Sequence, residues 1–264
     1  MLVGVGGLTV FLACAAAADE ELTNDACLAC HGTEGFAGPS GKPLAINADT
    51  FGAAVHSVLS CTTCHSDIEA IPHAETLKRV GIEPCAICHE DAVAAYRKSI
   101  HGVANSNGVT EAATCPDCHG NLHAITRRGE ATSAVHWSKL AAMCARCHAQ
   151  VDLAKKFGIP VAKPVEAYLK SVHARAVAEG KRGAECSDCH GVHDISPSSV
   201  PGSHISRSRV PETCGACHTE ILAQYRSSVH GEALAHGNWE APVCTDCHGE
   251  HRILGAGERA SPVF

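Results

Sequence analysis

The sequence predicts a mostly irregular protein with short α-helices, little or no β structure, and a repeated modular plan. One cysteine-rich pentapeptide recurs along the whole chain, and only 4% of the residues are aromatic. Residues 91–102, 164–180 and 220–231 alternate apolar and polar positions near the helical period. Residues 32–44 and 195–211 are rich in glycine, proline and serine and predict loops, and residues 252–264 predict a flexible tail.

The recurring pentapeptide is C-x-x-C-H, present in eight copies that use sixteen of the seventeen cysteines. We refer to the copies as motifs one to eight in chain order. Their cysteines are Cys27, Cys30, Cys61, Cys64, Cys85, Cys88, Cys115, Cys118, Cys144, Cys147, Cys186, Cys189, Cys214, Cys217, Cys244 and Cys247. Their histidines are His31, His65, His89, His119, His148, His190, His218 and His248.

This motif is typical of covalent attachment of c-type haem. Its two thiols add to the porphyrin vinyl groups, and the adjacent histidine becomes the proximal iron ligand. Zinc sites have no need of a histidine after every second cysteine, and a redox-active C-x-x-C is a single pair rather than eight. We therefore expect eight covalently bound haems. They must form much of the interior, because without its first 18 residues the chain offers only about 31 residues for each of them.

The motifs group into four modules of two. Before each second motif, an aromatic residue is followed five places later by histidine, as in YRKSIHG and YLKSVHA, and another histidine comes shortly after that motif. The interval from the first proximal histidine of a module to the aromatic-segment histidine alternates as 25, 12, 25 and 12 residues. This alternation predicts two tetrahaem halves, residues 19–127 and 128–264.

Counting histidines predicts two imidazole ligands on every iron. Eight of the nineteen histidines are proximal, and the repeat supplies eight more as distal ligands. These are His56, His73, His101, His123, His173, His193, His230 and His251. The remaining three, His136, His204 and His236, are expected to be solvated or to bind propionates.

The spacing also restricts which iron each distal histidine can reach. His193 follows proximal His190 by three residues, which extend to at most about 11 Å, too little to pass around a haem. His123, His193 and His251 are therefore expected to ligate neighbouring haems. The chain has only two methionines, Met1 and Met143, so methionine ligation is not expected and the potentials should be low.

The first 18 residues carry no charge and are mostly apolar, as in an export signal. A cleaved signal peptide, lipidation at Cys14 and a retained membrane anchor all fit this segment. Each places the remaining chain in the periplasm or outside the cell. The net charge of -7 argues against nucleic acid as a partner.

The pattern Y-x-x-S-[IV]-H-G followed by C-x-D-C-H-G-x-H-x-I resembles that of bacterial multihaem cytochromes c of the class III (tetrahaem-like) group. The resemblance covers residues 24–255 and implies a compact periplasmic electron carrier of anaerobic respiration. It further implies redox partners, namely a membrane quinol-oxidising cytochrome and a terminal reductase or outer-membrane conduit. The first module departs from the pattern at CHSDIEAIPH, which leaves His73 the least secure ligand.

Three functions remain open. The first is electron transfer by tunnelling between haems, with no catalytic residues. The second is an octahaem oxidoreductase acting on a small nitrogen or sulfur compound, which needs one iron with an open position. The third is a structural assembly, as an oligomer, a filament or a subunit of a membrane complex. Because the chain has enough histidines to saturate every iron, the sequence favours an electron-transfer protein over an enzyme.

Overall fold

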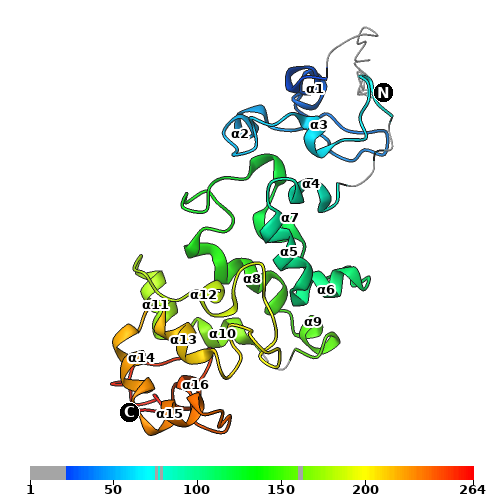
Figure 1. Cartoon of the computed structure of the whole chain (residues 1–264). Coiled ribbons are helices and arrows are strands. Elements are labelled where there is room, and N and C mark those ends of the chain that lie inside the picture. Colours follow the sequence, from blue (N-terminus) through cyan, green and yellow to red (C-terminus); the bar gives the residue numbers. More distant parts are fainter. Residues whose placement is uncertain (1–21, 75–76, 78–79, 160–162) are drawn as a thin grey trace. The chain divides into compact units, whose positions relative to one another are not determined.

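The computed structural model describes residues 22–74, 77, 80–159 and 163–264 (Figure 1). The chain divides into two compact units, residues 1–88 and 89–264. The predicted fold class is confirmed, because short helices joined by irregular segments make up both units. Within the described ranges, β structure is limited to an isolated antiparallel bridge between Ala37 and Pro43.

The described helices of the first unit are brief, and three of the four overlap C-x-x-C-H motifs. They are α1 (Asn24–His31), α2 (Ala48–Gly52), α3 (Cys61–Cys64) and α4 (Glu83–Ala86). Helix α1 begins where the Thr23 hydroxyl accepts a hydrogen bond from the Ala26 N–H. The Asn24 side chain joins the first two motifs, since its amide donates to the Leu59 carbonyl and its oxygen accepts from the Cys61 N–H.

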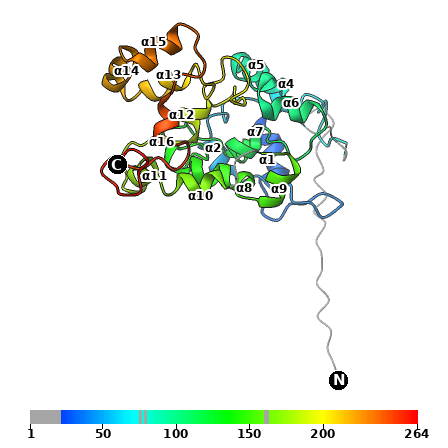
Figure 2. The same cartoon turned by 90° about the horizontal axis from the view of Figure 1, so that it is seen from below.

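The second unit repeats a simple order, in which a helix pair precedes a motif helix. Its elements are α5 (Glu90–Lys98), α6 (Ile100–Ser106), α7 (Cys115–His119), η1 (Leu122–Ala124), η2 (Trp137–Lys139), α8 (Leu140–His148), α9 (Val151–Lys156), α10 (Pro164–Tyr168), α11 (Val172–Ala178), α12 (Cys186–His190), α13 (Val210–Gly215), α14 (Thr219–Arg226), α15 (Val229–Ala235) and α16 (Cys244–His248). Figure 2 shows α13, α14 and α15 side by side, as Figure 1 does.

Side chains alone form a very small core in the described residues. The buried apolar side chains are Ala26, Ala54, Val93, Leu140, Val165, Ala174, Val210, Ala241, Val243 and Leu254. Four of these ten are alanines. Larger apolar residues near the motifs are instead exposed, such as Val58 at 87% and Ile87 at 71%. The side chains of the described residues therefore bury little apolar surface against one another.

The division into units does not coincide with the halves predicted from the repeat. The break falls between Cys88 and His89, inside motif three, whereas the predicted boundary at 127/128 lies within the second unit. The repeat describes an internal duplication of sequence, and the two tetrahaem halves remain a prediction.

The structure describes no part of residues 1–18, so the predicted signal or anchor and Cys14 lie outside the described residues. Across the described ranges, no helix combines the length and apolar character needed to cross a bilayer.

Candidate haem-binding sites

The structure places imidazole rings of motif histidines opposite those of histidines predicted as distal ligands, with ring planes 9–69° apart. Within the individual units, five such pairs have ring centroids 5.9–6.2 Å apart. They are His31 with His73, His101 with His148, His119 with His193, His173 with His218, and His190 with His251. Each pair joins one proximal histidine to one predicted distal histidine.

This separation fits one metal ion between two imidazoles. Nitrogen ligands bind a metal at about 2 Å, so rings on opposite sides of it have centroids roughly 6 Å apart. The described residues contain no group of three or more histidine, cysteine or acidic side chains that could hold a metal. A haem iron needs only two protein ligands because the porphyrin occupies the other positions. The pairs therefore fit haem and do not fit a zinc site of four protein ligands.

In the second unit, the pairs connect neighbouring modules in a fixed register. The proximal histidine of a first motif faces the aromatic-segment histidine of the preceding module, as in His148 with His101 and His218 with His173. The proximal histidine of a second motif faces a histidine of the following module, as in His190 with His251. His193 likewise faces His119 rather than the nearby His190.

The first module uses another arrangement. His73, the ligand furthest from the repeat pattern, faces His31 of its own module with ring planes 9° apart. The segment before its second motif contains α2 but, in the described residues, has no helix that carries the histidine, as α6, α11 and α15 do in the other modules. Phe51 and Ala54 stand where those modules carry tyrosine and serine, and His56 lies in a turn.

The other predicted ligands lie at helix ends or turns. His65 follows α3, His89 is the N-cap of α5, His123 lies in η1, His230 lies in α15, and His248 ends α16. The three histidines not expected to bind iron have ordinary polar contacts. His136 bonds to the Ser138 hydroxyl, His204 to Asp194, and His236 to the Glu232 carbonyl.

Burial keeps several of the paired imidazoles neutral. It lowers the pKa of His101, His148, His173 and His190, and for His190 the facing His251 lowers the pKa further. Iron binds the neutral imidazole, so a lowered pKa favours the ligating form at neutral pH.

In each aromatic segment of the second unit, a tyrosine hydrogen-bonds to the backbone just before the second motif of its own module. The hydroxyl of Tyr168 donates to the Ala184 carbonyl at 3.1 Å, two residues before motif six. Tyr96 donates in the same way to Ala113, and Tyr225 to Pro242, each at 2.9 Å. The residue two places before the motif is thus held by the tyrosine that precedes the distal histidine.

A serine then sets the direction of the histidine-bearing helix. Ser171 is fully buried, and its hydroxyl accepts from the Ala174 N–H at 3.1 Å as the N-cap of α11. Ser99 and Ser228 cap α6 and α15 in the same way. The cap starts each helix one residue before the histidine, which fixes the direction in which the imidazole projects.

The aspartate of C-x-D-C-H has a structural role that sequence reasoning did not assign. Asp246 accepts a hydrogen bond from the Val243 N–H at 2.7 Å, and Arg207 donates to the same carboxylate at 2.8 Å. The Val243 N–H and then Arg207 lower the pKa of this carboxyl. Asp117 and Asp188 accept equivalent bonds from Thr114 and Glu185. The tyrosine, serine and aspartate recur at equivalent positions of the sequence repeat. That recurrence could have indicated that they have a structural role.

Thiols of successive motifs lie next to one another. In the second unit, the Cys186 thiol donates to Cys144, which raises the pKa of Cys186 and lowers that of Cys144. The Cys214 thiol donates to Cys244, which lowers the pKa of Cys244 to about 7. In the first unit, burial and then Cys27 raise the pKa of Cys61 to about 11.

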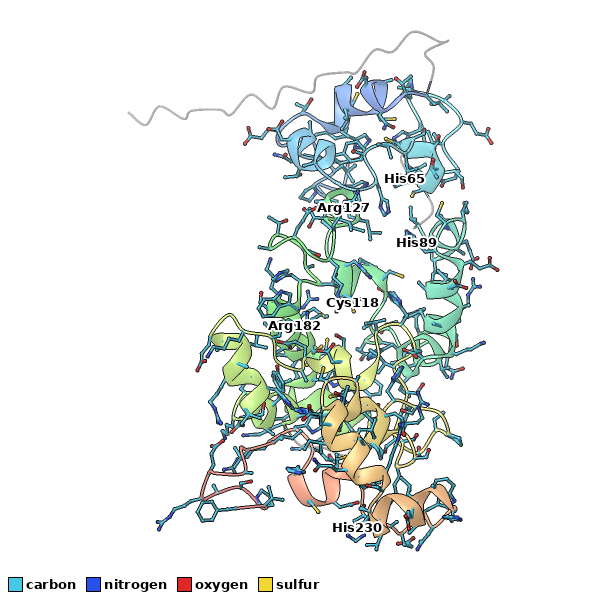
Figure 3. The ribbon with its side chains drawn as sticks, turned by 60° about the vertical axis from the view of Figure 1, so that its left-hand side comes forward. His65, His89, Cys118, Arg127, Arg182 and His230 are labelled. Carbon is cyan, nitrogen blue, oxygen red and sulfur yellow. The ribbon has the colours of Figure 1, made fainter. Side chains whose placement is uncertain are left out.

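The second cysteine of one module's second motif lies near the second cysteine of the next module's first motif. Burial raises the pKa of Cys189, with a smaller contribution from Cys217. Burial also raises the pKa of Cys118, with Cys147 among the smaller contributors. In the second unit, each of motifs four to seven therefore lies near the motif that follows it in the sequence. Figure 3 labels Cys118, from motif four, and His230, in the last module.

The glycine after a second motif adopts a backbone that other residues avoid. Gly191 has φ 81° and ψ -177°, and a Cβ added there would lie 2.9 Å from His204 Cδ2 and clash with Asp194. We expect Gly191→Ala to destabilise the holoprotein by about 1–3 kcal/mol, measured by denaturant unfolding. Gly129→Ala is the control, because nothing lies within 4 Å of a Cβ added there. Equal stability of the two variants would show that this backbone is not strained.

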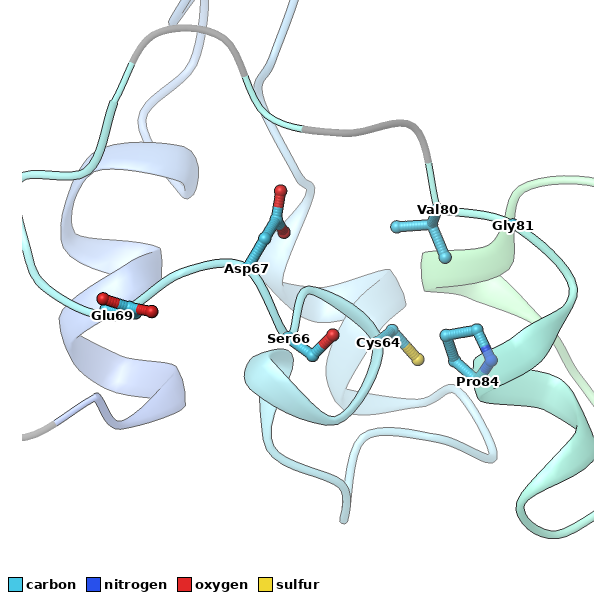
Figure 4. Close-up of a pocket in the computed structure, with 7 residues that line it drawn as sticks. All are labelled: Cys64, Ser66, Asp67, Glu69, Val80, Gly81 and Pro84. Atoms are coloured by element: carbon cyan, nitrogen blue, oxygen red, sulfur yellow. The ribbon is translucent and has the colours of Figure 1, made fainter.

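One hollow in the described residues adjoins motif two. It has a volume of about 440 Å³ and is lined by Cys64, Ser66, Asp67, Glu69, Val80, Gly81 and Pro84. Figure 4 shows the Cys64 sulfur directed toward Pro84. A smaller hollow lies against Cys214, His218 and Cys244. Both hollows are thus lined in part by motif cysteines.

No protein-family model matches this chain, and no solved structure matches it either. The assignment of these sites therefore rests on the motifs and on the geometry of the histidine pairs.

Proposed function

We propose that this protein is an octahaem c-type cytochrome that carries electrons by tunnelling from haem to haem. The observation that carries the proposal is the set of five facing histidine pairs, each uniting a C-x-x-C-H histidine with a histidine from elsewhere in the chain. Haem c attached at those motifs supplies reversible one-electron chemistry. The residues attach the haems, saturate their irons and set their order.

The neighbouring thiols support a linear order of haems. Haems attached at adjacent thiols, such as Cys144 and Cys186, would have porphyrin edges close to one another. The same holds for haems attached at Cys214 and Cys244. Electrons in the second unit would pass along motifs four to eight in chain order. Irons saturated by imidazole exchange electrons without binding substrate, which favours a carrier over an octahaem oxidoreductase.

A carrier of this kind would work outside the cytoplasm, where c-type haems and an exported chain belong. Its partners would be redox proteins, such as a membrane quinol-oxidising cytochrome, a terminal reductase or an outer-membrane conduit. This localisation and these partners remain proposals.

The proposal is tested by reducing the holoprotein stepwise and then adding candidate substrates. We expect eight electrons per chain, one for each motif, at low potentials, and no sustained turnover of nitrite, hydroxylamine or sulfite with an artificial electron donor. Sustained reduction of any of these compounds would establish the oxidoreductase instead. An uptake of fewer than eight electrons would contradict the octahaem assignment.

A further inference from the structure

A loop after motif one encloses the imidazole of His31. The His31 carbonyl accepts a hydrogen bond from the Ile46 N–H at 2.6 Å, and the Leu44 N–H donates to the Phe36 carbonyl at 3.0 Å. The Phe36 ring lies edge-on to the His31 ring, with centroids 5.1 Å apart and planes at 76°. Residues 33–46, which we call the first loop, therefore hold both the backbone and the ring of His31.

Both imidazoles of the first histidine pair also make a hydrogen bond through Nδ1. The His31 Nδ1 lies 3.0 Å from the Leu44 carbonyl oxygen, and the His73 Nδ1 lies 2.8 Å from that of Ala74. A carbonyl only accepts, so each Nδ1 carries the hydrogen and each Nε2 keeps its lone pair. The pair, whose ring planes are 9° apart, is thus fixed in the tautomer that binds a metal through Nε2.

Three histidine pairs of the second unit differ in this respect. They are His101 with His148, His173 with His218, and His190 with His251. Within the described ranges, none of these rings bonds to a backbone carbonyl. The His251 Nδ1 lies 3.9 Å from a Glu250 carboxylate oxygen, which is beyond hydrogen-bond distance. The first pair is therefore distinguished from these three by the carbonyl acceptors at Nδ1.

Building on the haem ligation proposed above, we propose that motif one holds an iron of lower reduction potential than motifs five, six and seven. An Nδ1–H that donates to a carbonyl makes its imidazole a stronger electron donor to the metal. A stronger donor favours ferric over ferrous iron, which lowers the reduction potential. The first loop and Ala74 supply this effect to both ligands of one iron, and Phe36 acts as a positioning residue for His31.

Methionine variants identify the iron behind each step of a redox titration of the holoprotein, followed by visible absorption. Methionine in place of one axial imidazole raises the potential of its own iron, so each variant displaces one reduction step. The variants to compare are His73→Met, His101→Met, His173→Met and His251→Met. The step displaced by His73→Met should be the lowest of the four. If another of these variants displaces a lower step, the inference is wrong.

Phe36 provides a second test that leaves every iron ligand in place. Phe36→Ala should raise the step identified by His73→Met and change the electron paramagnetic resonance signal of the pair whose planes lie 9° apart. Phe36→Tyr should retain both the potential and the signal, because it keeps the ring contact with His31. Phe157→Ala is the matched control and should alter neither, since Phe157 contacts the Lys156 ammonium. An unchanged potential and signal in Phe36→Ala would contradict the role of the first loop.

Intact mass separates a failure of this inference from a failure of the proposed function. Eight covalent haems, one for each motif, with a different order of potentials would overturn only the inference. Fewer than eight covalent haems would contradict the proposed function.

Discussion

Replacing His251 with alanine is expected to convert one of the eight irons from low spin to high spin. His251 faces His190 with ring centroids 6.0 Å apart and planes 15° apart, so it is the sixth ligand expected for the haem of motif six. Burial, followed by His251, lowers the pKa of His190, so the proximal imidazole stays neutral. The iron should therefore keep His190 and lose only its distal bond.

The reduced His251→Ala protein should bind one carbon monoxide per chain more than the parent at the same concentration, as followed by visible absorption. His136→Ala is the matched control, since His136 bonds to the Ser138 hydroxyl and belongs to no facing pair in the described residues. A His251→Ala protein with unchanged carbon monoxide uptake would show that His251 does not ligate iron. Extra carbon monoxide uptake by the control variant would show that the assay detects a general loss of structure and not the loss of one iron ligand.

The same chain made without haem is expected to lose its fold. The buried apolar side chains in the described residues are few and include four alanines, while larger residues such as Val58 and Ile87 are exposed. A side-chain core this small cannot offset the conformational entropy of ordering the chain. The iron bonds that join modules, such as the one expected between His101 and His148, would also be absent.

Far-ultraviolet circular dichroism and hydrogen exchange measure this effect. The haem-free chain should show little helical signal and almost no protected amides, whereas the holoprotein should unfold cooperatively. A narrower variant, Cys186→Ala with Cys189→Ala, should remove the haem of motif six and loosen the region around α8 and α12, which pack together. A haem-free chain that unfolds cooperatively with native helical content would disprove the dependence.

The fold class could be predicted from the sequence because the repeat limits the length of the elements between motifs. About 31 residues per motif allow only short helices and loops around each haem. The reach of the chain also predicted that His193 ligates a neighbouring haem and not the one attached beside it. It did not identify His119 as the counterpart, because that depends on how α7 and the segment after α12 are placed in space.

Other features needed the structure because they depend on long-range contacts. The tyrosine hydroxyls donate to carbonyls 16 or 17 residues away, as Tyr168 does to Ala184. A tyrosine that recurs in the sequence does not reveal which carbonyl accepts its hydrogen bond. His73 departs from the repeat in sequence and yet faces His31. The break between units falls inside motif three, where no change in composition marks it.

The most direct test of the account is electron paramagnetic resonance of the fully oxidised holoprotein, with the haems counted by intact mass. The account predicts eight covalent haems, one for each motif, and low-spin iron alone in the concentrated protein. It also predicts two kinds of low-spin signal. The His119–His193 and His190–His251 planes lie 15° apart, while the His101–His148 planes lie 69° apart. A high-spin iron at any of these pairs, or a count below eight, would contradict it.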